Sequence, residues 1–147
     1  MTDEIAQIAT DAVSSPAGHY SQATSWRELV FVSGQFGRRQ DGSHTSDQPF
    51  EVQARQALDN LLAILREAGC GPEQILRVTV YIAGVENWAV FNRIYAERLG
   101  EAKPARTVVP VAELHHGYLV EVEAIAARRL PIATPKTMQL LQCDRKV

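Results

Sequence analysis

The chain has 147 residues, of which 46% are hydrophobic and 22% are charged, and its formal net charge is −2. A chain of this length usually forms one domain with a sizeable core, and this charge gives no basic field that would gather nucleic acid. No apolar run is long enough to span a membrane, and the first residues do not resemble a signal peptide. The cysteines are too few for a disulfide framework or a zinc site. We therefore expect a reduced cytoplasmic protein without a metal, nucleic-acid or membrane partner.

The N-terminal part of the chain divides into a leader and the first strands. Residues 1–15 carry only a weak helical pattern, at Ile5 and Ile8, and we interpret them as a loosely held leader. The turn residues that follow lead into a short strand near Tyr20. Residues 29–34 are rich in β-branched and aromatic side chains, which predicts a strand that ends where glycine allows close backbone approach.

A long amphipathic helix follows a polar loop. It begins near Pro49, because proline is favoured in the first turn of a helix, and Gly69 ends it. Its apolar residues recur at intervals of three and four, which is typical of a helix with one buried face. They are Ala54, Ala57, Leu58, Leu61, Leu62, Leu65 and Ala68.

The next two elements are a half-buried strand and a second amphipathic helix. Residues 75–82 alternate strictly between apolar and more polar positions, which predicts a strand. Its inward residues would be Leu76, Val78, Val80 and Ile82. Residues 87–99 predict a helix that ends at Gly100 and whose apolar stripe comprises Trp88, Phe91, Tyr95 and Leu99. Asn92 lies at the edge of that stripe, where a polar side chain either supports a neighbouring loop or belongs to a site.

The last two strands lie around Arg106 and over residues 119–127. The second strand is apolar but carries Glu121 and Glu123, which share one face because side chains alternate along a strand. A turn at residues 115–117 would make the two strands antiparallel neighbours and bring Arg106 beside Glu121. Residue types alone leave two interpretations open. One is a structural ion pair, and the other is a small polar site in which the arginine binds a carboxylate and the glutamate holds a water.

The order strand, strand, helix, strand, helix, strand, strand predicts an α+β layer with a mixed sheet and both helices on one face. The other face of the sheet then needs cover. A second copy of the same sheet supplies it most simply, so we expect a cyclic homo-oligomer. Regular patterns end from Pro131 onward, and we expect a domain over residues 16–130 followed by an appended tail over residues 131–147. His115 and His116 are interpreted as loop residues, since adjacent histidines do not easily ligate one metal.

Short motifs from residue 18 to residue 127 make the chain similar to the RidA/YjgF family of imine deaminases. Each motif is weak alone, but together they occur in the family's order and register. They are GHYSQA at 18–23, VSGQ at 32–35, QARQALDN at 53–60, WAVFNRIY at 88–95, PART at 104–107 and VEVEAIA at 120–126. The resemblance implies a chorismate-mutase-like α+β fold and a homotrimer with its sites between subunits.

The resemblance also implies an activity. Family members hydrolyse reactive 2-imino or enamino acids, released by pyridoxal-phosphate enzymes, to 2-keto acids and ammonia. Such substrates carry a carboxylate beside an electrophilic carbon, so Arg106 would bind the carboxylate through its planar fork and Glu121 would activate the attacking water. No metal or organic cofactor is implied, because a protonated imine is already electrophilic. The other implied substrate-binding positions are Tyr20, Ser33, Gly34, Asn92 and Val108.

The chain departs from the family pattern at three places, Val108, His19 and His115. Val108 stands where many members have a cysteine, so the resemblance assigns no catalytic role to a thiol. The two histidines replace prolines, which leaves the substrate preference open. Two other functions also stay open: a non-catalytic ligand-binding or regulatory member of the same fold, and a ribonuclease or translation inhibitor. The net charge of −2 does not favour the ribonuclease.

Overall fold

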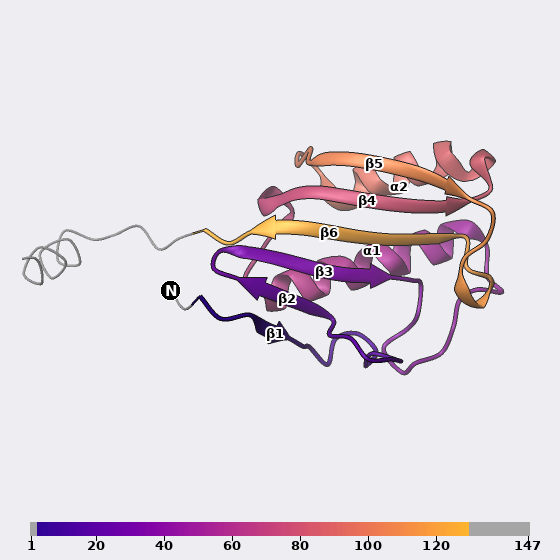
Figure 1. The fold of residues 1–147 in the computed structure, drawn as a ribbon. Helices are drawn as coiled ribbons and strands as arrows, with labels where there is room; N and C mark the ends of the chain where they lie inside the picture. The colour runs from indigo at the N-terminus through magenta and orange to yellow at the C-terminus, as the bar shows by residue number, and fades with distance from the viewer. Residues whose placement is uncertain (1–2, 130–147) are drawn as a thin grey trace, which may run out of the picture.

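The computed structural model describes residues 3–129, which form one mixed sheet and two long helices (Figure 1). The strands are β1 (Ala6–Ile8), β2 (Ala23–Trp26), β3 (Leu29–Gln35), β4 (Ile75–Ala83), β5 (Ala105–Val111) and β6 (Val120–Ala127). The helices are α1 (Phe50–Glu67) and α2 (Trp88–Leu99), and the short 3-10 turns are η1 (Pro72–Gln74), η2 (Val85–Asn87) and η3 (His115–Gly117). Within residues 3–129, no helix combines the length and apolar character needed to cross a membrane.

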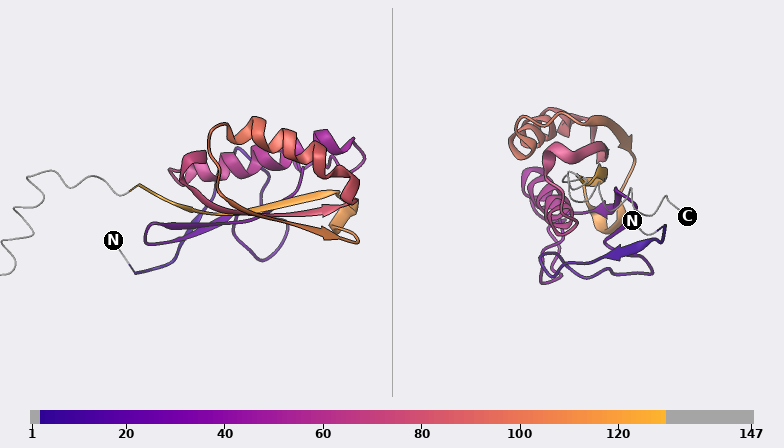
Figure 2. Two further views of the ribbon diagram at one scale, coloured as in Figure 1. Left: turned by 90° about the horizontal axis from the view of Figure 1, so that it is seen from above. Right: turned by 90° about the vertical axis from the view of Figure 1, so that its left-hand side faces the viewer.

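The strands are arranged in the order β1-β2-β3-β6-β4-β5, which places β6 in the interior of the sheet. β4 and β5 pair in parallel, and the other neighbouring strands pair antiparallel. The units β3–α1–β4 and β4–α2–β5 therefore both cross between parallel strands, and both move in the same direction across the sheet. Because such crossovers are right-handed, both helices lie on one face, as Figure 2 shows. This arrangement confirms the predicted α+β layer.

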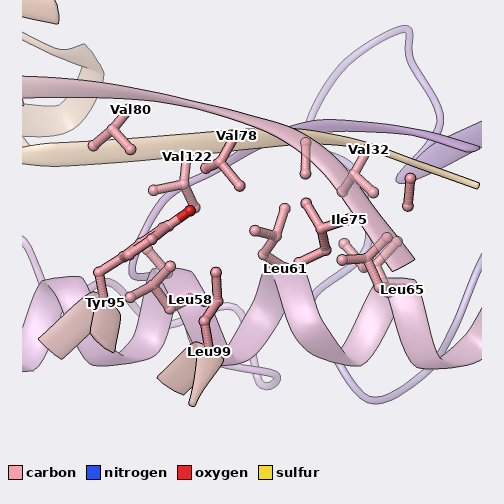
Figure 3. Close-up of a cluster of buried hydrophobic side chains, with 14 of the residues drawn as sticks. Val32, Leu58, Leu61, Leu65, Ile75, Val78, Val80, Tyr95, Leu99 and Val122 are labelled. Carbon is pink, nitrogen blue, oxygen red and sulfur yellow. The ribbon is translucent and has the colours of Figure 1, made fainter. Parts of the chain in front are cut away.

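The hydrophobic core fills the space between the helices and the sheet (Figure 3). Leu58, Leu61 and Leu65 of α1 are completely buried there. Val78 of β4 and Val122 of β6 are also completely buried and close the core from the sheet side. The predicted stripe of α1 and the alternation of β4 and β6 therefore have one cause, the burial of a single shared apolar layer.

The predicted ends of both helices are confirmed. α1 begins directly after Pro49, and Gly69 lies just beyond its last turn with a φ of 78°. Gly100 follows α2 with a φ of 60°. This left-handed conformation lacks a steric penalty only for glycine, which explains why both helices stop where they do.

Two local predictions are wrong. Ile5 and Ile8 do not belong to a helix, because Ala6–Ile8 forms β1 and pairs antiparallel with β2 at the edge of the sheet. Leu76 does not point inward: its exposed fraction is 49%, whereas Ile75 is buried. An irregularity in the pairing of β4 with β6 between Ile75 and Arg77 shifts the alternation by one residue at this end of the strand.

The predicted pairing of the strands that carry Arg106 and Glu121 is also wrong. β4 separates β5 from β6, and β5 runs parallel to β4. The α2 crossover delivers β5 to the outer edge of the sheet, and the chain then returns through η3 to place β6 between β3 and β4. Residues 131–147, our predicted tail, lie outside the described residues, and the division of the chain at residues 15 and 130 stays a prediction.

We expect Leu61→Ala to lower the free energy of unfolding by about 2–5 kcal/mol, because it opens a cavity in a fully packed layer. Leu76→Ala removes the same atoms from an exposed position and should change it by less than about 1 kcal/mol. Urea unfolding of both variants at one protein concentration provides the comparison. If the two variants lose equal free energy of unfolding, Leu76 is buried, which would contradict the assigned irregularity in β4.

Candidate functional site

Glu121 lies against the backbone of Gly34, where β3 and β6 pair irregularly. Val32 pairs with Ala124 and Gln35 pairs with Val122, so β3 holds an extra residue between these two positions. Such bulges commonly redirect side chains beside functional sites. A Cβ atom on Gly34 would overlap the carboxyl oxygen of Glu121. The missing side chain of this glycine therefore provides the space that the carboxyl group occupies.

The surroundings of Glu121 raise the pKa of its carboxyl group. Burial is the main cause, and the negative charge of Glu123 adds to it, whereas the positive charge of His115 acts in the opposite direction. A carboxyl with a raised pKa accepts a proton more readily than an ordinary glutamate does. Glu121 is therefore suited to general acid–base chemistry.

Ser33 and Tyr20 are both placed beside Gly34, but in different ways. The Ser33 hydroxyl donates a hydrogen bond of 2.7 Å to the backbone oxygen of Ser21 and so ties the bulge to the preceding segment. Tyr20 has an exposed fraction of 54%, and its hydroxyl accepts a hydrogen bond of 3.3 Å from the backbone N–H of Ala17. Tyr20 and Gly34 line the same narrow cleft. We call Tyr20, Ser33, Gly34 and Glu121 the carboxylate half of the candidate site.

The other predicted positions form a separate group, the arginine half, which comprises Asn92, Arg106 and Val108. The guanidinium carbon of Arg106 lies 4.9 Å from the ring centroid of Tyr95 on α2. Asn92 is exposed on α2, one turn before Tyr95. Val108 is partly buried and packs against the core from β5.

The two halves lie on opposite faces of the sheet within one chain. Arg106 pairs with Val78, whose side chain points to the helices. Glu121 pairs with Tyr81, which alternates with the buried Val80 and therefore points away from the helices. Among residues 3–129, neither Arg106 nor Glu121 forms an ion pair. The structural ion pair between the two strands is thus contradicted, because β4 lies between them.

Next to the carboxylate half is a hollow that the sequence did not predict. It has a volume of about 440 Å³, and we call it the histidine pocket. Its polar lining comprises Tyr20, Arg38, His44, His115, His116 and Tyr118. The interpretation of His115 and His116 as plain loop residues missed it, because His44 joins them only through the tertiary fold. The replacement of a family proline by His115 was the one available signal. Within residues 3–129, no three His, Cys, Asp or Glu side chains are placed to hold a metal ion.

Comparison with known proteins identifies the family. The model of the family described as "Endoribonuclease L-PSP" matches residues 10–128, which is most of the chain. The chain belongs to this family. It is 38% identical over 119 residues to a RutC family protein from Pyrococcus horikoshii, a match that covers 81% of this chain and 94% of that protein.

Two further L-PSP family relatives carry more specific names. A mouse protein named 2-iminobutanoate/2-iminopropanoate deaminase is 34% identical over 121 residues, which covers 82% of this chain and 90% of that protein. The crystal structure of E. coli TdcF with bound serine matches with a TM-score of 0.80 and 31% identity, over 84% of this chain and 99% of that one. The fold is thus shared with a family member that holds a small amino acid.

The raised pKa of Glu121 leads to a stability prediction. In the folded state its charged form is disfavoured, so stability falls as the pH rises from the ordinary glutamate value through the raised value. Glu121→Gln keeps the shape without the charge and should make the protein more stable than the parent at about pH 8. The difference should disappear at about pH 4, where the parent carboxyl is protonated in the folded state.

Urea unfolding at both pH values measures this effect. Glu113→Gln, which changes an exposed loop carboxylate, is the matched control. A Glu121→Gln variant that is no more stable than the parent at about pH 8 would contradict the assigned burial of the charge.

Proposed function

We propose that the protein hydrolyses imines and enamines of 2-amino acids to 2-keto acids and ammonia. The observation that carries this proposal is the Glu121 carboxyl group, which is held against Gly34 with a raised pKa. The name of the mouse relative supports it, and the bound serine of TdcF agrees with a ligand of amino-acid size. These matches share the L-PSP fold with this chain over most of its length.

In the proposed reaction, Arg106 binds the substrate carboxylate through paired hydrogen bonds. Glu121 accepts a proton from a water molecule while the water oxygen attacks the imine carbon. The proton then passes to the nitrogen of the tetrahedral intermediate, the carbon–nitrogen bond breaks, and ammonia leaves as the hydroxyl proton is released and the keto group forms. An enamine first gains a proton on carbon to become the imine. The protonated imine is itself electrophilic, so these steps use no organic cofactor or metal.

The remaining predicted residues have supporting roles in this proposal. Gly34 leaves room for the Glu121 carboxyl and the substrate, and Ser33 holds the bulge in place through its bond to the backbone. Tyr20 forms one wall on the carboxylate half. Asn92 and Val108 form the polar and apolar walls beside Arg106.

The proposal requires more than one chain, because Arg106 and Glu121 occupy opposite faces of the sheet. We propose a homotrimer in which the arginine half of one subunit meets the carboxylate half of the next. The face opposite the helices supports this assembly, since Phe31 of β3 is 40% exposed there and adjoins a hollow of about 380 Å³ lined by Arg77 and Glu123. A cyclic arrangement would cover this face and complete three equal sites.

Assays distinguish this activity from two alternative functions. A ligand-binding or regulatory member would bind keto acids without accelerating imine hydrolysis. The family description names an endoribonuclease, but a net charge of −2 provides little attraction for a polyanion. Incubation with single-stranded RNA tests this possibility, and cleavage that is lost in Arg106→Ala would favour it.

We expect Arg106→Ala and Arg106→Lys both to lower kcat/KM by roughly 30- to 1000-fold, because each loses the bidentate contact to the carboxylate. Glu121→Gln should still bind the keto-acid product but hydrolyse imines slowly, since an amide cannot accept the proton. The assay generates 2-iminobutanoate with threonine dehydratase and follows release of the keto acid. Arg66→Lys, an exposed arginine on α1, is the control. If the Arg106→Ala variant is as active as the parent, the arginine has only a structural role and the proposed substrate contact is wrong.

Mixed trimers test the site between subunits. Light scattering at micromolar concentration should give three times the mass of one chain. When Arg106→Ala and Glu121→Gln subunits are co-expressed with different tags and trimers carrying both tags are purified, about one site in three should combine a native arginine with a native glutamate. These mixed trimers should therefore recover about a third of the parent activity, although each variant alone is nearly inactive. A monomer, or mixed trimers with no recovered activity, would contradict the assembly.

A further inference from the structure

The histidine pocket concentrates groups that carry or acquire positive charge. Arg38 and three histidines line it, and the lining side chains include no aspartate or glutamate. The His115 and His116 rings stack with centroids 3.8 Å apart, and His44 lies 4.6 Å from His116. Like-charged groups gather this closely at a cost, which an anion placed among them would remove.

Neutral backbone groups hold Arg38 at this pocket. Its guanidinium donates hydrogen bonds to the backbone oxygens of Gly42, at 3.0 Å, and Ser15, at 3.4 Å. Neutral carbonyl groups fix its position without neutralising it. Among residues 3–129, no carboxylate forms an ion pair with Arg38. The side chain is thus held in place beside the pocket with its charge uncompensated.

The walls of the pocket are aromatic and hold its shape. Phe36 stacks on Tyr118 with ring centroids 4.8 Å apart, and Tyr118 is 1% exposed. The Tyr118 hydroxyl lies 2.9 Å from Nδ1 of His44, which fixes the orientation of that imidazole. Burial lowers the pKa of His116, and the charges of His115, His44 and Arg38 lower it further. Phe36 and Tyr118 thus form an aromatic wall, whereas His115, His116 and Tyr20 are exposed, so an anion can reach the pocket from solvent.

The pocket adjoins the carboxylate half. Tyr20, Phe36 and Arg38 line both the histidine pocket and the cleft that contains Gly34. His115 is close enough for its charge to lower the pKa of Glu121. A substrate with its reacting carbon at Glu121 therefore has room to extend its side chain past Tyr20 into the pocket.

We propose that the histidine pocket receives a side-chain carboxylate, so that the preferred substrates are imines or enamines of dicarboxylic amino acids. The reaction itself rests on the proposed function, whereas the pocket's choice of an anion is independent of turnover. Arg106 would hold the carboxylate beside the imine, and Arg38 with the imidazoles would hold the second one. A substrate with a short apolar side chain would leave Arg38 and the imidazole N–H groups without an anionic partner.

Binding of stable keto acids tests the pocket without turnover. Calorimetry compares 2-oxoglutarate with 2-oxopentanoate, which has the same carbon chain but no second carboxylate. The parent should bind 2-oxoglutarate at least about tenfold more tightly, because hydrogen bonds between charged groups are the stronger kind. In both His116→Asn and Arg38→Gln, this ratio should fall to within about threefold. Asparagine suits position 116, because His116 has a φ of 58° and asparagine tolerates that conformation.

Matched controls change the same residue types outside the pocket. His19→Asn changes an exposed histidine, and Arg39→Gln changes the arginine next to Arg38 in the chain. Neither residue lines the histidine pocket. Both should keep the parent's preference for 2-oxoglutarate. Turnover is then compared between 2-iminoglutarate, generated from D-glutamate by D-aspartate oxidase, and 2-iminopentanoate, generated from D-norvaline by D-amino-acid oxidase.

The binding and turnover results test the pocket proposal and the deaminase proposal separately. A preference for the dicarboxylate that is lost in both pocket variants and kept in both controls supports the proposal. Equal affinity for the two keto acids, or a preference that survives in both variants, overturns it. If neither imine is hydrolysed faster than in buffer while the binding preference holds, the deaminase proposal fails and the anion pocket stands.

Discussion

The position of β6 between β3 and β4 is the constraint on which the rest of the structure depends. An interior strand must satisfy both neighbours and both faces, so its alternate residues separate into a buried apolar row toward the helices and a half-buried row on the other side. Glu121 belongs to the half-buried row, together with Glu123 and Ile125. Its depth in the sheet supplies the partial burial that raises its pKa, and an edge strand would have left the same carboxyl in water.

The same constraint separates the two charged residues of the candidate site. With β6 in the interior, β5 can join only at the outer edge of β4, and its register turns Arg106 toward α2. One chain therefore presents the two halves of a site on different faces. In the proposed trimer, the two halves of the candidate site would come together only where subunits meet.

Much of the fold follows from local patterns. The three- and four-residue spacing around Leu58 and the alternation through Val80 both reflect burial of one apolar layer, so a local pattern predicts them. The glycines at the helix ends are predicted for a different local reason, their positive φ. The wrong predictions occur where the pairing of strands determines the structure. Ala6–Ile8 is too short to carry a pattern and becomes a strand by adding to β2, and the exposure of Leu76 follows from a pairing irregularity with another strand.

By itself, the sequence determined the α+β class and the two amphipathic helices, because residue type and spacing fix local conformation and the buried face. The resemblance to a known family supplied the candidate site residues. Only the tertiary structure decided which of those residues meet. It placed Glu121 against Gly34 and turned Arg106 to the opposite face. It also joined His44 to His116 across a long stretch of chain. Strand order and long-range contacts arise from the packing of the whole layer, and no local pattern encodes them.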